Sequence, residues 1–146
     1  MIECHIYVET SITWPKKGDG IVGLIFTDKD EKNTRQLFGV VRNSTMHHAV
    51  LFGIKNALGY CTQFDVIHIH TGDAYVANAF KWLDKWNASS WIKSNGQPVQ
   101  YATEWQAIYE NLKQKNLEIH LGEFNGYRNW IKNECVMRGR KHGFIL

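Results

Sequence analysis

The chain has 146 residues, of which 44% are hydrophobic and 13% aromatic, and its formal net charge at pH 7 is +3. This length and apolar content suffice to bury one sizeable core, so a single domain over residues 1–146 is expected. The longest apolar runs fall well short of the roughly 20 residues that span a bilayer, and the N-terminus lacks a basic region followed by an apolar one. Together these features predict a cytoplasmic protein with no signal peptide and no membrane partner.

The N-terminal half alternates between strand and helix patterns. Three short runs rich in β-branched and aromatic residues, separated by Gly, Lys and Asp, predict successive antiparallel strands at 2–8, 21–27 and 37–41. Apolar residues then recur at helical spacing over 46–57, and Gly59 is placed to end this helix. Residues 64–71 follow as a buried strand. A helix between two strands implies a crossover and parallel pairing.

The C-terminal half continues the same alternation. Asp73 is well placed to cap a helix over 75–86, because an aspartate before a helix satisfies free backbone amides. Apolar spacing predicts another helix over 101–112, a last strand over 117–121 and a final helix over 127–137. The element order therefore predicts an α/β protein.

The stretch from His70 to Ile108 carries the strongest motifs. It contains the turn Thr71-Gly72-Asp73-Ala74-Tyr75-Val76, then a helix with two tryptophans, then Trp91-Ile92-Lys93 and a helix opening with Glu104-Trp105-Gln106. It resembles the second half of a type 1 ribonuclease H, whose turn reads Thr-Asp-Ser-x-Tyr-Val. The N-terminal run His5-Ile6-Tyr7-Val8-Glu9-Thr10-Ser11 resembles the first strand of that family. The resemblance implies a ribonuclease H-like fold: a five-stranded mixed sheet, its first three strands antiparallel, with helices on both faces.

The resemblance also locates the family's four catalytic carboxylates, which fall here on Glu9, Val50, Gly72 and Asn133, and its mobile histidine, which falls on Glu123. Hydrolysis of a phosphodiester by two metal ions needs several converging carboxylates. With one acid left, the resemblance implies a pseudoenzyme with lost or strongly impaired hydrolysis and no cofactor. An active protein would need Mg²⁺ or Mn²⁺.

An alternative is a divergent, active endonuclease of RNA–DNA hybrids that uses Glu9, Asp73 and either Glu123 or Glu134 on a shifted backbone. Asp73 comes one residue late for this role, and a one-residue step after a strand points a side chain to the opposite face. Glu134 is likewise displaced by about 100° around the final helix from the family's position. The same residues, Glu9, Asp73 and Glu134, are the expected ligands if any metal is bound.

Histidines and cysteines give no strong metal-binding motif. His68 and His70 alternate on one face of the strand over 64–71, and His120 lies on the last strand, an arrangement that a transition-metal site would use. Histidines with partners inside the sheet are the simpler interpretation. The three cysteines are odd in number and far apart, which favours reduced thiols over a disulfide framework.

What remains of the family pattern predicts weak binding to nucleic acid, either an RNA–DNA hybrid or an RNA duplex. The family's polar loop and basic protrusion correspond here to Ser44, Thr45, His47, Lys81, Trp82, Lys85, Trp86, Trp91 and Lys93. Asp84 and the uncharged loop 87–90 weaken the electrostatic contribution. We interpret Trp86 and Trp91 mainly as packing residues. A second basic cluster, with Arg128, Lys132, Arg138, Arg140 and Lys141, is either a phosphate-binding face or a solvated helix end. A third interpretation is a protein–protein interaction module.

Overall fold

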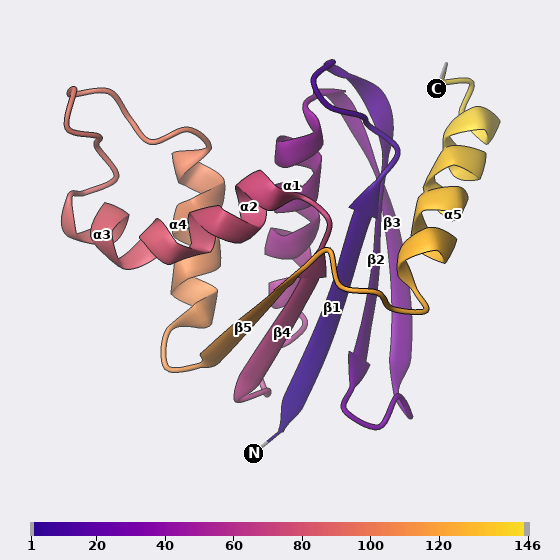
Figure 1. Cartoon of the computed structure of the whole chain (residues 1–146), viewed down its shortest axis with the longest axis horizontal. Coiled ribbons are helices and arrows are strands. Elements are labelled where there is room, and N and C mark those ends of the chain that lie inside the picture. Colours follow the sequence, from indigo (N-terminus) through magenta and orange to yellow (C-terminus); the bar gives the residue numbers. More distant parts are fainter. Residues whose placement is uncertain (1, 145–146) are drawn as a thin grey trace.

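Five strands form one mixed sheet in the order β3-β2-β1-β4-β5 (Figure 1). The structure, a computed structural model, describes residues 2–144. The strands are β1 (Glu3–Thr10), β2 (Gly18–Asp28), β3 (Thr34–Ser44), β4 (Val66–Thr71) and β5 (Asn116–Leu121). The β1–β2 and β2–β3 pairs are antiparallel, whereas β1–β4 and β4–β5 are parallel. The predicted sheet is therefore confirmed. The β2–β3 hairpin is longer than expected because its pairing runs from Thr27↔Thr34 to Gly18↔Ser44.

Helices cover both faces of this sheet, as predicted. They are α1 (Met46–Leu58), α2 (Ala74–Ala79), α3 (Leu83–Ala88), α4 (Ala102–Leu112) and α5 (Arg128–Lys141). The prediction of a single helix over 75–86 is wrong, because a 3₁₀ turn at Phe80–Trp82 divides the segment into α2 and α3. In this turn Phe80 packs edge-on against Trp105 of α4. Among residues 2–144, no helix combines the length and the apolar character needed to cross a membrane.

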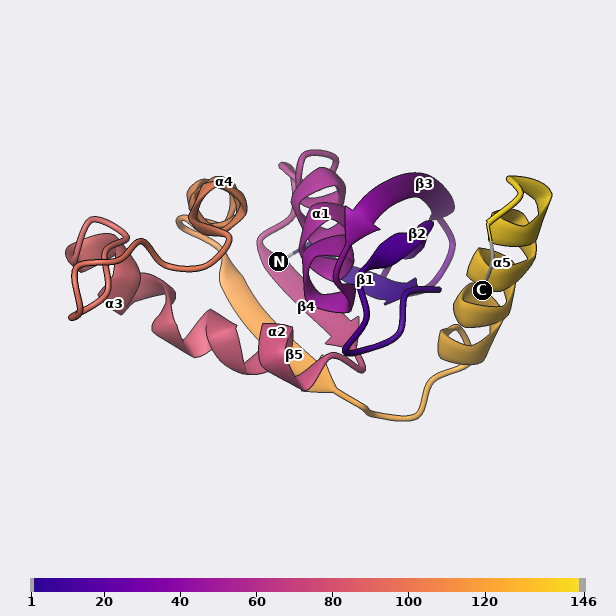
Figure 2. The same ribbon diagram turned by 90° about the horizontal axis from the view of Figure 1, so that it is seen from above.

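The two faces of the sheet have different cores. On β1, Ile6 and Val8 join the larger core with α1 and α4, while Tyr7 joins a smaller core with Ile131 and Cys135 of α5. This division follows from strand geometry, because successive side chains point to opposite faces. Figure 2 shows α1 and α4 on one side of the sheet and α5 on the other. In the larger core, the sulfurs of Cys4 and Cys61 lie 3.4 Å apart as free thiols.

Two glycines allow helices to approach β2 closely. A Cβ atom on Gly23 of β2 would lie 2.8 Å from Ile131 and 2.9 Å from Cys135, so this glycine lets α5 pack directly on the strand. On the other face, Gly53 of α1 lies against Val22, where an added Cβ would come within 2.9 Å. The close packing of α5 matters for function, because it fixes which of the helix's polar residues face the end of β1.

Candidate active site and nucleic-acid interface

A pocket of about 140 Å³ lies where β1 and β4 end. The residues that line it include four charged ones and two of the positions aligned with the family's carboxylates: Glu9, Asp73, Arg128 and Lys132, and Val50 and Gly72. Because β1 and β4 are parallel, their carboxyl ends meet at one edge of the sheet, which brings Glu9 and Gly72 together. The structure thus brings together three of the four positions that the family resemblance marks as catalytic.

Glu9 is buried beside two cations of its own chain. Its side chain is 9% exposed, and its Oε2 atom lies 3.8 Å from Nε of Arg128. Burial raises the pKa of Glu9 above the ordinary value, while the positive charges of Arg128 and Lys132 act in the opposite direction. Cations of the protein itself therefore offset part of the cost of burying this carboxylate.

Arg128 also fills the space next to Gly72. A Cβ atom built on Gly72 would collide with a terminal nitrogen of the Arg128 guanidinium and would lie 2.9 Å from its Cζ atom. A carboxylate at this position therefore requires Arg128 to move away. From the sequence, Arg128 was assigned only to the basic cluster of the final helix. No neighbouring residue in the sequence indicates that its side chain reaches the ends of β1 and β4.

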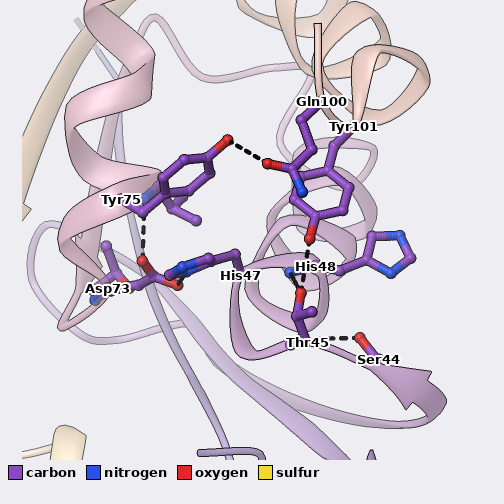
Figure 3. A network of polar contacts seen from close by, with 10 residues as sticks. Ser44, Thr45, His47, His48, Asp73, Tyr75, Gln100 and Tyr101 are labelled. Carbon is purple, nitrogen blue, oxygen red and sulfur yellow. Dashed lines mark hydrogen bonds and ion pairs between the residues drawn. The ribbon is translucent and has the colours of Figure 1, made fainter. Parts of the chain in front are cut away.

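Asp73 has its two carboxylate oxygens engaged (Figure 3). Oδ1 accepts a hydrogen bond from the amide of Val76 at 3.1 Å, which confirms the predicted N-cap of α2. Oδ2 lies 2.7 Å from Nδ1 of His47. The carboxyl group is 2% exposed and sits within this local network, so it holds the start of α2 against α1.

The remaining predicted site residues lie outside the pocket. Asn133 is exposed, and the residue of α5 that lines the pocket is Lys132. The predicted position, Asn133, is therefore one residue away from the residue that lines the pocket. The reason is the rotation of α5: Ile131 and Cys135 are buried, and Arg128 and Lys132, four residues apart, share the face turned to the pocket.

The two glutamates of the alternative active site are also directed elsewhere. Glu134 pairs with Arg138 at 3.4 Å, and Glu123 is exposed and pairs with His120. Glu9 and Asp73 line the same pocket but Glu134 does not, so the three carboxylates do not converge there.

These residues do not fit a magnesium site. Magnesium takes oxygen ligands in a nearly octahedral array and is held through carboxylates and substrate phosphates. Val50 and Gly72 have no ligating atoms, Asp73 is bound to α2 and His47, and Glu9 faces the guanidinium of Arg128. An ion placed here would meet the two positive charges of Arg128 and Lys132 and two carboxylates that already have partners.

Aromatic side chains, of which Trp14, Tyr75 and Trp82 are exposed and His47 is half-buried, form a row beside the pocket. His47 stacks on Tyr75 with ring centroids 4.5 Å apart and makes a tilted contact with Trp14 at 4.7 Å, and Trp14 is 61% exposed. In the 3₁₀ turn that follows α2, Trp82 is 48% exposed, and the ammonium group of Lys85 lies 5.0 Å from the centre of its ring. We call Trp14, His47, Tyr75, Trp82 and Lys85 the aromatic row. Trp14 and Tyr75 were not among the residues predicted to bind nucleic acid, although a tryptophan followed by Pro15-Lys16-Lys17 indicates an exposed turn rather than a core.

The other predicted nucleic-acid residues divide into structural and exposed groups. Ser44 is buried, and its hydroxyl donates a hydrogen bond to the Thr45 carbonyl. The Thr45 hydroxyl caps α1 by accepting from the His48 amide, and it lies 2.8 Å from the hydroxyl of Tyr101 (Figure 3). Trp91 is buried and Trp86 packs between it and Trp105, in agreement with the packing interpretation. Lys81 and Lys93 are exposed, but Lys81 lines a separate hollow next to β5.

No family model matches the chain. A ribonuclease H from Thermoanaerobacter sp. (strain X514) is 30% identical over 104 residues, which are 67% of this chain and 57% of that protein. LC9-RNase H1, a type 1 RNase H with the type 2 active-site motif, superposes with a TM-score of 0.75 at 11% identity, covering 99% of this chain and 75% of that one. The foamy viral protease-reverse transcriptase in complex with RNA/DNA hybrid gives a TM-score of 0.70 at 13% identity, covering 93% of this chain and 19% of that one.

The order of strands and the helices on both faces define an α/β protein with the ribonuclease H fold. Curated proteins named ribonuclease H are homologues of this chain, and its structural neighbours are RNase H domains. It spans 57% of the length of the Thermoanaerobacter relative. The comparisons therefore establish the fold, whereas the chemistry of the candidate site rests on the residues that this chain places there.

Proposed function

We propose that this chain is a ribonuclease H-like domain that binds RNA–DNA hybrid or RNA duplex without hydrolysing it. The observation that carries the proposal is the position of Arg128, whose guanidinium lies beside Glu9 and fills the space into which a side chain at position 72 would project. In the family pattern, this space belongs to carboxylates that hold metal ions. Here a cation of the protein itself neutralises the remaining carboxylate.

The surface next to the pocket supports binding. Exposed aromatic rings stack on bases, and such stacking contributes about 1–3 kcal/mol per base. The aromatic row offers rings from the loop after β1 and from α1, α2 and the 3₁₀ turn, with Lys85 placed to contact a phosphate. A structural neighbour, the foamy viral protease-reverse transcriptase, is known in complex with RNA/DNA hybrid. The fold is therefore compatible with such a ligand.

The first expected result is that the purified protein does not cleave an RNA–DNA hybrid with either Mg²⁺ or Mn²⁺. The reason is that the pocket's two carboxylates are engaged, Glu9 by Arg128 and Asp73 by α2 and His47, so it lacks the free ligands that would hold metal ions against the scissile phosphate. The measurement is gel-based cleavage of a labelled hybrid at enzyme excess over hours. Robust cleavage that disappears in Glu9→Ala would overturn the proposal, and cleavage that persists in this variant identifies a contaminating nuclease.

A second expected result concerns binding through the aromatic row. Trp82→Ala should weaken binding of hybrid by about tenfold, because one stacking contact is lost. Lys85→Glu should weaken binding and lower the slope of log affinity against log salt by about one, as loss of one phosphate contact requires. Fluorescence anisotropy over a salt series measures both quantities.

The matched control is Lys32→Glu, which makes the same charge change in the exposed turn between β2 and β3. It should leave the salt slope unchanged. If the parent protein binds neither hybrid, duplex RNA nor single strands at low salt, the proposal fails and a protein-interaction module becomes the better description.

A further inference from the structure

Four histidines from three neighbouring strands cluster on one face of the sheet: His5, His68, His70 and His120. The register explains the cluster, because His5 lies opposite His68 across β1 and β4, and His70 lies opposite His120 across β4 and β5. The rings are stacked, with centroids 4.1 Å apart for His5 and His68 and 4.3 Å for His70 and His120. This is the face on which α5 packs, but α5 lies along β2 and β1, away from β4 and β5 (Figure 1).

Within this cluster, three donor atoms surround a common point. Nδ1 of His68 lies 3.0 Å from Nε2 of His120 and 3.1 Å from Oε2 of Glu118. Nε2 of His120 lies 4.0 Å from the same oxygen of Glu118. A tetrahedral zinc ion with ligand bonds of about 2.0–2.1 Å holds its ligand atoms roughly 3.3 Å apart. The observed separations bracket this value, so small side-chain adjustments would complete one face of such a tetrahedron.

Outer carboxylates orient both imidazole rings for this role. The remaining nitrogen of His68, Nε2, lies 2.9 Å from Glu3, and the remaining nitrogen of His120, Nδ1, pairs with Glu123. A carboxylate that accepts from one ring nitrogen fixes the tautomer and leaves the lone pair on the other nitrogen. In neutral rings, His68 and His120 therefore direct two lone pairs toward a third acceptor, the carboxylate of Glu118. Three converging acceptors repel one another unless they share a proton or a metal ion.

Access and ligand type narrow the choice of cation. The side chain of Glu118 is 60% exposed, whereas that of His68 is 9% exposed, so the site is anchored in the sheet and open on one side. Imidazole nitrogen suits zinc and other divalent transition metals rather than magnesium, which prefers oxygen. We propose that His68, His120 and Glu118 bind a Zn²⁺ ion and leave one coordination position for water. This site is separate from the pocket at Glu9, and the inference is independent of the proposed function.

The test uses the full chain without a histidine tag, stripped with EDTA and dialysed. Titration calorimetry with ZnCl₂ is expected to show saturable binding of one ion per chain, and ZnCl₂ should raise the melting temperature because the ion binds the folded state. His120→Gln and Glu118→Gln should each weaken zinc binding by at least about tenfold. Substitution with Co²⁺ should give the visible absorption of a tetrahedral site in the parent and not in His120→Gln.

Two controls separate this site from other histidines. His142→Gln changes an exposed histidine after α5, and His5→Gln changes a stacked histidine outside the donor set; both should retain zinc affinity. Glu118→Gln lies on an exposed side chain, so it tests the site even if His120→Gln does not fold. The proposal is overturned by the absence of saturable binding. It is equally overturned if Glu118→Gln binds like the parent while His70→Gln does not, since the ion would then sit among His70, His120 and Glu123.

Discussion

Replacing Arg128 with alanine will destabilise the protein by about 1–2 kcal/mol at pH 8 and by much less at pH 4. Arg128 is the cation that faces the buried carboxylate of Glu9. Loss of one partner from a fully buried pair costs more than this, but the Arg128 side chain is 35% exposed, and solvent screening reduces the effect.

The pH dependence follows from the raised pKa of Glu9. Because the folded state binds this proton more tightly than the unfolded chain, ionisation of Glu9 lowers stability as the pH rises above the ordinary value of 4.5. Arg128 opposes this loss. Without Arg128 the pKa of Glu9 rises further, so the penalty of the substitution grows with pH and nearly disappears where Glu9 is protonated.

Urea unfolding of the parent and Arg128→Ala at several pH values between 4 and 8 measures the effect. The double variant Glu9→Gln, Arg128→Ala should remove most of the added pH dependence, because no carboxylate remains to ionise. Arg140→Ala is the matched control, since it removes the same charge from an exposed position of α5. A penalty for Arg128→Ala that is equal at all pH values would show that Arg128 stabilises the helix rather than the charge of Glu9.

The sheet and most helices were predictable because their signals are local. The helical spacing over 46–57 matches α1, and an aspartate at position 73 before a helix can satisfy a free amide wherever the segment lies. The predicted helix over 75–86 was less successful. Its periodicity was correct, but the 3₁₀ turn occurs where Phe80 packs against Trp105, a contact that depends on α4.

The candidate site was harder to predict because it depends on how α5 is rotated about its axis. The buried stripe of this helix consists of Ile131, Cys135 and Gly139, of which only one is a large apolar residue. Such a stripe gives little periodic signal, and an error of one residue exchanges Lys132 for Asn133. The rotation is set instead by close packing against Gly23 of β2, a residue distant in sequence.

The histidine cluster shows the same limit of local reasoning. The alternation of His68 and His70 on one face of a strand was evident from spacing two apart. The 3.0 Å distance between His68 and His120, and the nearby carboxylate of Glu118, could not be predicted without the β4–β5 register. This register pairs His68 with Glu118 and His70 with His120. Likewise, the proximity of Cys4 and Cys61 arises only after β1 and the end of α1 pack together.

A magnesium site should appear when the pocket's two cations are removed and carboxylates are introduced at three of its positions. The variant is Val50→Glu, Gly72→Asp, Arg128→Ala and Lys132→Asp, with Glu9 retained, and it places four acids on positions that line one pocket. Arg128→Ala is essential because the guanidinium otherwise occupies the space of the new Asp at 72. Position 132 replaces position 133 because Lys132 is the pocket residue of α5.

Without metal, the variant should melt well below the parent, because carboxylates in one cleft repel one another and resist ionisation. Magnesium binds only the folded arrangement, so at a hundred times its dissociation constant it should restore about 2.7 kcal/mol, or roughly 5–10 °C in melting temperature. The parent should show no comparable shift. Differential scanning fluorimetry with MgCl₂, and with KCl at equal ionic strength, distinguishes binding from general screening.

The matched control carries Gly72→Asn in place of Gly72→Asp, which keeps the size of the side chain and removes its charge. It should lose most of the magnesium-dependent stabilisation, since a neutral amide does not offset the dehydration of the ion. If the four-fold variant folds but gains no more from MgCl₂ than from KCl, its carboxylates do not converge. The pocket at the ends of β1 and β4 would then not correspond to the catalytic centre of the family, and the interpretation of Arg128 as its replacement cation would be wrong.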